Sequence, residues 1–398
     1  MRRAAVVSAL RTPVGSFGGS LRTLAADQLV AQVIQALMTR TGIDPAALDE
    51  VVVAQAYASS EAPCIARYAA LAAGLPLDLP GYSVDRRCGS GLQAVIDASM
   101  LVQTGAADVV LVAGVESMSN VEFYSTDMRW GARLGSVRMH DRLQRGRERS
   151  QPPERFGEIS GMPETVENLV REYDIMRSAA DAFAATSHQR AAKAFAEGRF
   201  DQEIVPVRVS QRKGDDLVIA HDEGIRADST QASLSKLKPL LDGGTVTAGN
   251  ASQQSDAAAA CLVVAENRLN SLNLEPMAFL HSWAAAGCHP ATMGIGPVPA
   301  VAKLMARNGL SLQDMDLVEL NEAFAAQVLA VLKGWHWFEE ERLNVNGGGI
   351  SLGHPIGATG VRILATLLHE LGRRRGRYGL ETMCIGGGQG LAAVFERE

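Results

Sequence analysis

The sequence predicts an α/β protein built from layers of helix and sheet, and three observations favour this fold class. Short apolar runs typical of buried strands, such as residues 51–54 and 109–112, alternate with longer stretches of helical period, as in strand-helix-strand units around parallel sheets. Hydrophobic residues make up 47% of the 398 positions, which is enough for a large core and for two or three domains. Two distant segments also repeat one order of parts, which predicts two halves of similar design.

The composition argues against several functional classes. The chain has 38 basic and 44 acidic residues, a formal net charge of −6, so it offers no overall attraction to nucleic acid or anionic lipid. No apolar run approaches the roughly 18 residues of a membrane span, and the first residues read as a strand and not as a signal peptide. Five scattered cysteines indicate free thiols in a reducing compartment, and no His/Cys cluster suggests a metal site. We therefore expect a cytoplasmic protein with no membrane span, metal or nucleic-acid partner.

The repeated segments each place a glycine-rich turn between a strand and a helix. In the first, residues 82–84 lead into Cys88 and its glycines, and a helix follows until Gly105. In the second, residues 343–345 lead into His354, and a helix follows until Gly372 before a strand that ends near Ile385. If a pseudo-twofold axis relates the halves, Cys88 and His354 occupy equivalent helix N-termini and face each other.

Cys88 is the candidate nucleophile. At the start of a helix, free backbone N–H groups and the helix dipole favour a thiolate. The alternative is that an isolated cysteine is a small buried hydrophobe. Gly89 and Gly91 favour the nucleophile, because they allow a substrate carbonyl to approach the backbone closely.

His354 is the candidate base. Pro355 is suited to the first position of a helix, and the helix end is expected to lower the pKa of the imidazole, so that a neutral ring can accept a proton. The alternative is an ordinary histidine, one of eight in the chain. The glycines around it favour a functional role.

Cys384 ends an apolar strand and is followed by a glycine-rich loop over 386–390, which brings a second thiol near a ligand. The loop lacks the Gly-x-Gly-x-x-Gly spacing of a dinucleotide site. Asn321 follows a strand-like run and could hold a water or an oxyanion, although a turn or helix cap is the commoner role. Two thiols and an imidazole indicate acyl transfer through a thioester, with Cys384 as the base at the α carbon in a Claisen-type condensation.

The stretch from about 119 to 249 differs from its surroundings and predicts an insertion. It contains an arginine-rich segment over 129–155 that could meet phosphates or form a solvated or subunit-contact face. An alanine-rich helix is expected to begin at Ser178, with Asp181 three residues later.

Several motifs in one order resemble the thiolase family over essentially the whole chain. They include Asn-Glu-Ala-Phe at 321–324, Gly-His-Pro-Ile-Gly at 353–357 and Cys-Ile-Gly-Gly-Gly-Gln-Gly at 384–390, and further matches lie at 11–19, 88–92, 113–119, 244–252 and 293–297. The resemblance, to the acetyl-CoA acetyltransferase or 3-ketoacyl-CoA thiolase type, implies reversible CoA-dependent cleavage of 3-oxoacyl-CoA or the reverse condensation.

The resemblance also implies an architecture. It suggests two pseudo-twofold-related halves of the five-layered α/β/α/β/α thiolase fold, formed by residues 1–118 with 250–272 and by 273–398. Residues 119–249 would be an inserted loop domain for CoA binding and subunit contacts, and the chain would form a homodimer or homotetramer.

By position, the resemblance implies a role for each catalytic candidate. Cys88 would be acylated, His354 would activate it, and Cys384 would handle the α proton. Asn321 would hold a water in one oxyanion hole, and the backbone N–H groups of Cys88 and Gly386 would form another. CoA and acyl-CoA would be substrates, with no permanently bound cofactor, and the CoA contacts would be Arg226, Ser233, Ala248, Ser252, Met162 and Phe324.

Two departures from the family pattern bear on the site. Asp85-Arg86-Arg87 stands where many relatives have Asn-Gln-Leu, and these cations either lower the pKa of Cys88 or point away into a subunit contact. Gly161 stands where short-chain members have a histidine, which leaves the preferred acyl chain open. Two alternative functions remain: a ketosynthase-type condensing enzyme, which pairs its cysteine with two histidines, and a non-catalytic thiolase-like protein that binds lipid or CoA.

Overall fold

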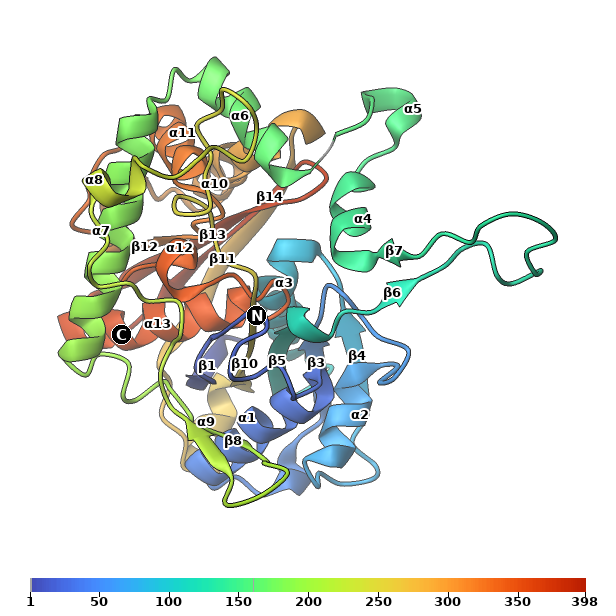
Figure 1. Ribbon diagram of the computed structural model, residues 1–398. Coiled ribbons are helices and arrows are strands. Elements are labelled where there is room, and N and C mark those ends of the chain that lie inside the picture. The colour runs from blue at the N-terminus through green and yellow to red at the C-terminus, as the bar shows by residue number, and fades with distance from the viewer. Residues whose placement is uncertain (1, 160) are drawn as a thin grey trace.

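The computed structural model describes residues 2–159 and 161–398, and its centre is a ten-stranded sheet (Figure 1). The strand order is β12-β13-β14-β11-β1-β10-β5-β3-β4, and the short β2 pairs with β10. The first half contains β1 (Ala4–Arg11), β2 (Gly15–Ser16), β3 (Glu50–Ala54), β4 (Gly81–Val84), β5 (Val109–Ser117) and β10 (Ser255–Ala265). The second half contains β11 (Ala278–Gly287), β12 (Leu317–Leu320), β13 (Tyr378–Ile385) and β14 (Gln389–Glu396).

The pairing pattern of the strands repeats on either side of the β1–β11 contact, where Val6 lies opposite Ala278. Outward from β1, β1 pairs with β10 and β10 pairs with β5, both antiparallel, and β5 then pairs with β3 in parallel. Outward from β11, β11 pairs with β14 and β14 pairs with β13, both antiparallel, and β13 then pairs with β12 in parallel. The predicted duplication is therefore confirmed. The expectation of parallel sheets is only partly right, because β13 and β14 form a hairpin and a hairpin joins antiparallel strands.

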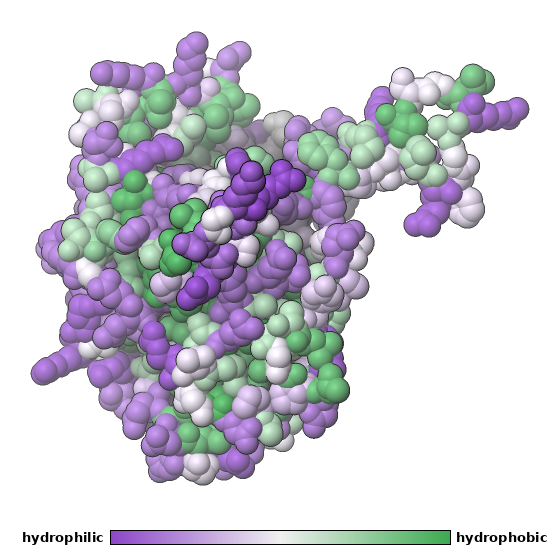
Figure 2. Space-filling view, turned by 60° about the horizontal axis from the view of Figure 1, so that its bottom comes forward, coloured by the Kyte–Doolittle hydropathy of each residue, from purple (hydrophilic) through white to green (hydrophobic). Residues whose placement is uncertain are grey.

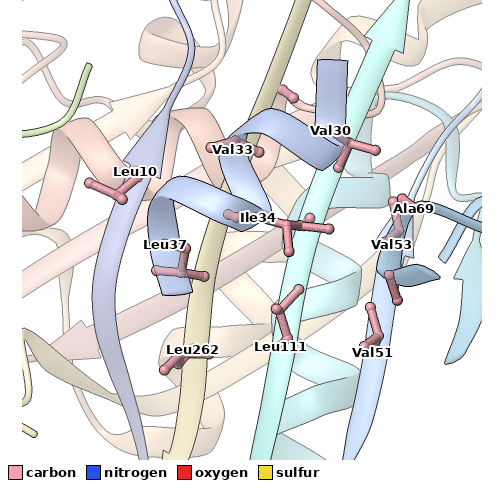
Figure 3. Close-up of a cluster of buried hydrophobic side chains, with 14 of the residues drawn as sticks. Leu10, Val30, Val33, Ile34, Leu37, Val51, Val53, Ala69, Leu111 and Leu262 are labelled. Atoms are coloured by element: carbon pink, nitrogen blue, oxygen red, sulfur yellow. The ribbon is translucent and has the colours of Figure 1, made fainter. Parts of the chain in front are cut away.

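Helices cover both faces of each half and give five layers. The outer face of the first half carries α1 (Ala26–Thr41) and α2 (Ile65–Ala72), and the outer face of the second carries α10 (Pro297–Asn308) and α11 (Ala325–Trp335). Between the halves lie α3 (Ser90–Thr104) and α13 (Thr359–Arg374), whose apolar residues share one core with both. Figure 3 shows the outer core of the first half, where one face of α1 packs on the strands through Val30, Val33, Ile34 and Leu37.

The two central helices cross at glycines. A Cβ on Gly360 would lie 2.0 Å from the backbone nitrogen of Leu92, and a Cβ on Gly91 would lie 2.8 Å from the nitrogen of Gly360. No larger residue permits this approach of two helix backbones. The crossing brings together the N-terminal ends of α3 and α13, which are preceded by Cys88 and His354.

The segment expected as an insertion contains short elements around one long helix. They are β6 (Phe123–Tyr124), β7 (His140–Asp141), α4 (Arg142–Glu148), α5 (Pro153–Phe156), α6 (Met162–Glu172), α7 (Arg177–Ala196), β8 (Val207–Val209), β9 (Leu217–Ile219) and α8 (Gln231–Leu234). Between β6 and β7 the chain forms an arm that extends away from the body in both overall views (Figures 1 and 2). The boundaries 119–249 remain a prediction. Within the described residues, no helix has the length and apolar character needed to cross a membrane.

Two expected helix boundaries are wrong. The long helix α7 begins at Arg177 after Met176, and Ser178 does not cap it. Instead the Asp181 carboxylate accepts one hydrogen bond within the helix, from Arg177 at 2.7 Å, and one tertiary hydrogen bond, from the Asn250 amide at 2.9 Å, and these take the place of a capping box. Helix α13 continues to Arg374, two residues beyond Gly372.

Residues 343–345 do not form the predicted strand. Asn344 has a φ of 44°, which interrupts extended backbone. Its side-chain amide accepts from the N–H of Leu320 at 2.9 Å and donates to the Leu320 carbonyl at 2.8 Å. The backbone therefore makes only a single parallel bridge to β12, between Leu343 and Val318, and the side chain of Asn344 continues the pairing where β4 pairs with β3 along four residues in the first half.

Candidate active site

Four of the five residues expected to carry the chemistry converge on one cavity of about 210 Å³, and Asn321 is the one that does not line it. Cys88 lies in the turn before α3, and His354 lies in the loop between α12 (Gly349–Leu352) and α13. Cys384 lies near the end of β13, and Gly386 begins the β13–β14 turn. All four line the cavity, so the spatial convergence predicted from the duplicated design is confirmed by the geometry.

Cys88 is partly exposed on the cavity wall. Burial raises the pKa of its thiol, although hydrogen bonds from the backbone N–H groups of Gly386 and of Cys88 itself, and the charges of Arg87 and Arg147, act in the opposite direction. The backbone donors and the cations thus favour the thiolate as predicted, but the loss of water outweighs them, and the pKa of the thiol is raised. The neutral thiol needs a base, and it already faces two N–H donors that suit an oxyanion.

His354 is buried and neutral. Its pKa is lowered to about 3, mainly by burial and also by the positive charges of Arg362 and Arg147. The direction matches the prediction but the expected cause does not: α13 begins at Thr359, four residues after Pro355, so His354 is not in the first turn of the helix.

A hydroxyl sets the tautomer of this ring. The Thr359 hydroxyl donates to the Pro355 carbonyl at 3.0 Å, so it accepts at 2.6 Å from the Nδ1–H of His354. The remaining ring nitrogen, Nε2, is buried with no hydrogen-bond partner. Its free lone pair is the site at which the imidazole can accept a proton.

Glu116 fixes the loop that carries His354. This buried carboxylate at the end of β5 accepts from the backbone N–H groups of Ala56 at 3.0 Å, Tyr57 at 3.2 Å and Gly357 at 2.9 Å. Burial raises its pKa to about 7 against the effect of these bonds. Glu116 thus joins the two halves beside the cavity, a positioning role that the sequence analysis did not assign to it.

Cys384 is buried, and burial together with the neighbouring Cys88 and Cys288 raises the pKa of its thiol well above the usual value. It is therefore a proton donor at rest. Cys288 is a third thiol, half-buried beside Met293, that sequence reasoning missed. Its isolated position in the sequence gave no signal.

Asn321 is not among the residues that line the cavity. It is buried, and neither its amide oxygen nor its amide nitrogen has a hydrogen-bond partner. A Cβ on Gly349 would come within 3.1 Å of that oxygen, so the glycine leaves the amide open to the loop before His354. Buried polar atoms without protein partners suit a bound water.

The residues expected to contact CoA fall into two groups. Ser252, Met162 and Phe324 line the cavity with Cys88. Three others are exposed on the segment leading to it, and none of them lines the cavity: Arg226, Ser233 and Ala248. The structure thus brings the first group to the reacting sulfur and leaves the second at the surface.

The arginines left open by the sequence separate in space. Arg87 lines the cavity, and its charge lowers the pKa of Cys88. Arg86 lies near Asp97, where burial raises the pKa of the carboxyl and the charge of Arg86 acts against this rise, and it is not among the lining residues. Of the arginine-rich stretch, Arg147 reaches the cavity, whereas Arg129 and Arg133 lie on the exposed arm.

Family comparison agrees with this geometry. Residues 4–267 match the thiolase N-terminal domain and residues 274–397 match the thiolase C-terminal domain. The chain belongs to the thiolase family. It is similar to an acetyl-CoA acetyltransferase of Chromobacterium violaceum, with 44% identity over 99% of each chain, and to a probable acetyl-CoA acetyltransferase of Escherichia coli, with 43% identity over 100% of each.

Solved thiolase structures share its fold. The Bacillus anthracis acetyl-CoA acetyltransferase superposes with a TM-score of 0.95 at 40% identity, covering 100% of this chain and 99% of that one. Human mitochondrial 3-ketoacyl-CoA thiolase in complex with CoA superposes with a TM-score of 0.93 at 38% identity, covering 100% and 98%. The chain is therefore an acyltransferase of the five-layered thiolase fold. Within residues 2–159 and 161–398, no group of three or more acidic, histidine or cysteine side chains is placed to hold a metal ion.

Proposed function

We propose that this thiolase cleaves 3-oxoacyl-CoA with free CoA, and catalyses the reverse condensation, through an acyl group on Cys88. The observation that carries the proposal is the meeting of Cys88, His354, Cys384 and Gly386 in one cavity. Both thiols are protonated at rest and the imidazole is neutral.

In the first half-reaction, Nε2 of His354 takes the proton of the Cys88 thiol, and the sulfur attacks the C3 carbonyl carbon of the substrate. The bond between C2 and C3 breaks, and its electron pair stays on C2. Cys384 donates its proton to C2, and acetyl-CoA leaves. The raised pKa of Cys384 suits this role, because burial keeps the proton on the sulfur until a strong base develops beside it.

In the second half-reaction, the Cys384 thiolate takes the proton of an incoming CoA thiol. The CoA sulfur attacks the acyl carbon, the bond between this carbon and the Cys88 sulfur breaks, and Cys88 takes back the proton that His354 has held. The N–H groups of Cys88 and Gly386 are the donors proposed for the acyl oxygen, since both already face the Cys88 sulfur. Asn321 is proposed to hold the water of the second oxyanion hole, consistent with its two unpartnered amide atoms.

CoA is the substrate proposed for the wider site, with no permanently bound cofactor. The pantetheine arm is proposed to pass Ser252, Met162 and Phe324, and the nucleotide end to reach Arg226, Ser233 and Ala248. A phosphate on exposed Arg226 would gain a charge-assisted hydrogen bond.

The arm between β6 and β7 supports a homo-oligomer, proposed as a dimer or tetramer. Trp130 and Leu134 on it are 96% and 93% exposed, and large apolar side chains in such a position suit a contact with a second copy. Sedimentation of a Trp130→Ser, Leu134→Ser double variant tests this, and an unchanged mass would oppose it. A cytoplasmic location is proposed because the five cysteines are unpaired.

The ketosynthase alternative receives no support from the cavity. The described residues that line it include one histidine, His354, and Cys384 stands where a second histidine would be needed. Release of CO₂ from a malonyl thioester would favour that alternative.

Mass spectrometry after brief exposure to acyl-CoA thioesters tests the proposed function. We expect acyl transfer to Cys88 in the wild type, none in Cys88→Ala, and an acyl-enzyme that accumulates without condensation in Cys384→Ala. Cys64→Ala, at an exposed thiol that does not line the cavity, is the matched control. If Cys88→Ala still turns over, or if 3-oxoacyl-CoA thioesters of several lengths remain uncleaved, the proposal fails.

A further inference from the structure

The cavity carries two positive charges and no negative one. Arg87 and Arg147 both line it, and none of its described lining residues is aspartate or glutamate. His354 is neutral there, so it does not change this balance. Among the residues that the structure describes, neither guanidinium forms an ion pair within 4 Å of a carboxylate, although other arginines form 14 such pairs.

Both guanidinium groups are held in place by neutral partners. The Arg87 guanidinium stacks 5.5 Å from the centre of the Tyr57 ring and donates to the carbonyl of Gly146. Arg147 donates from both terminal nitrogens to the amide oxygen of Gln254, at 3.0 and 3.2 Å. This holds in the amide orientation that gives both the oxygen and the nitrogen of Gln254 suitable partners. These contacts leave other N–H donors of each group free, and they fix the planar groups before a ligand binds.

Helix α4 is fitted closely to this arrangement. A Cβ on Gly146 would lie 3.0 Å from Cε1 of Tyr57 and 3.4 Å from a terminal nitrogen of Arg87. The Tyr57 hydroxyl also donates to the Leu143 carbonyl at 3.2 Å. The backbone that carries Arg147 is therefore packed directly on the stack of Tyr57 and Arg87.

The arginines lie away from the proposed nucleotide end of CoA. Ser233 belongs to α8, on the left of Figure 1, whereas α4 lies to the right of the centre, beyond the start of α3. The electrostatic influence of Arg147 reaches Cys88, His354 and Tyr57. The pair of charges is thus placed around the reacting sulfur, where the acyl group and not the coenzyme phosphates would lie.

We infer that the enzyme prefers 3-oxoacyl-CoA substrates whose acyl chain ends in a carboxylate, and that Arg87 and Arg147 bind this terminal anion. The inference rests on the proposed function. In thiolytic cleavage, the carbons from C3 to the far end of the chain are transferred to Cys88, so the terminal carboxylate remains next to this sulfur in the acyl-enzyme. The C2–C3 bond breaks, the Sγ–C3 bond forms, and C2 leaves in acetyl-CoA with the proton of Cys384. The carboxylate itself undergoes no change.

The test compares two substrates of equal carbon number, 3-oxohexanedioyl-CoA and 3-oxohexanoyl-CoA, on the full-length protein. We expect the wild type to show the higher kcat/KM with the diacid, and mass spectrometry to find the ω-carboxyacyl group on Cys88. We expect Arg87→Leu and Arg147→Met each to lower the ratio of the two kcat/KM values by about ten- to a hundredfold, as for loss of a hydrogen bond to a charged group. Lysine at either position should give an intermediate ratio, since it keeps the charge but not the planar fork.

Arg149→Met is the matched control, because Arg149 is exposed two residues beyond Arg147 and does not line the cavity. It should leave both kcat/KM values unchanged. The inference is overturned if the wild type cleaves the uncharged substrate as well as the diacid, a comparison that needs no variant. It is also overturned if the arginine variants slow the cleavage of both substrates equally. That result would mean that the two arginines act on Cys88 or on CoA and do not bind the end of the acyl chain. Failure of the wild type to cleave either substrate would instead overturn the proposed function.

Discussion

Replacing Thr359 by valine removes the hydroxyl that sets the tautomer of His354 and keeps the shape of the side chain. Thr359 is fully buried at the start of α13. Its hydroxyl accepts from Nδ1 of His354 at 2.6 Å and donates to the Pro355 carbonyl at 3.0 Å. In Thr359→Val, the ring can carry its proton on Nε2, the atom that must be free to receive the proton of Cys88.

The magnitude follows from these two bonds. Each neutral hydrogen bond contributes about 0.5–1.5 kcal/mol net, and a buried donor left unpaired costs about 1–3 kcal/mol. We therefore expect the free energy of unfolding to fall by about 1–3 kcal/mol. The bond from Nδ1 strengthens when the imidazole becomes charged during proton transfer, and a bond to a charged group contributes about 1.5–3 kcal/mol. Its loss from the transition state predicts a fall in kcat of about ten- to a hundredfold.

The assay is steady-state thiolysis of a 3-oxoacyl-CoA at saturating CoA, with the rate of Cys88 alkylation by iodoacetamide as a second measurement. Both rates should fall in Thr359→Val, whereas Thr359→Ser, which keeps the hydroxyl, should retain most of the kcat. A valine variant that is folded and retains kcat within about threefold of the wild type would refute the assignment of the tautomer to Thr359.

Three further predictions concern the frame of the site. Gly360→Ala should abolish folding or destabilise the protein by more than about 4 kcal/mol, because the added Cβ would lie 2.0 Å from the nitrogen of Leu92. Gly372→Ala in the same helix, whose Cβ would meet only Arg397 at 4.0 Å, should stabilise it by up to about 1 kcal/mol in urea unfolding; equal effects of the two would contradict the close crossing. Burial lowers the pKa of His354 from 6.5 to about 3, so the unfolded chain gains a proton below pH 6.5 that the folded protein does not. The stability from the neutral ring is complete above pH 6.5 and decreases as the pH falls, so the difference in unfolding free energy between wild type and His354→Asn should shrink by about 2 kcal/mol from pH 6.5 to 5.0. If this difference in unfolding free energy stayed constant with pH, the pKa of His354 in the folded protein would be the same as in the unfolded chain. Glu116→Gln replaces one acceptor oxygen by an amide that faces backbone donors, and should lower stability by about 2–4 kcal/mol and kcat by more than about tenfold. Glu122→Gln, at a surface ion pair with Arg142, should change stability by less than about 1 kcal/mol, and a Glu116 variant with normal kcat would exclude the positioning role.

Much of the fold could be predicted because its signals are local. The apolar runs at 51–54 and 109–112 correspond to β3 and β5, and Gly105 ends α3 in the left-handed conformation. Two of the differences involve side chains whose partners lie far away in the sequence. Asn344 bonds to Leu320 after a single backbone bridge to β12, and Asp181 binds Asn250 in place of capping a helix.

The candidate site was predictable to a similar extent. Cys88, His354 and Cys384 stand beside glycines that make them visible in the sequence, and all three line the cavity. Glu116 and Thr359 carry no such mark, because their roles depend on backbone and ring atoms that come near them only after folding. The raised pKa of Cys88 could not be predicted for the same reason, since the backbone donors that favour the thiolate are local and the exclusion of water is not.

The amino-acid sequence by itself determined the duplicated α/β design and the identity of the reacting groups, because strand and helix periodicity and the glycines around a nucleophile act over a few neighbouring residues. Only the tertiary structure decided the protonation states, the tautomer of His354 and the gathering of Arg87 and Arg147 around the sulfur. Desolvation, hydrogen bonding and charge depend on distances through space, and the crossing of α3 and α13 sets those distances between residues more than 200 positions apart along the chain.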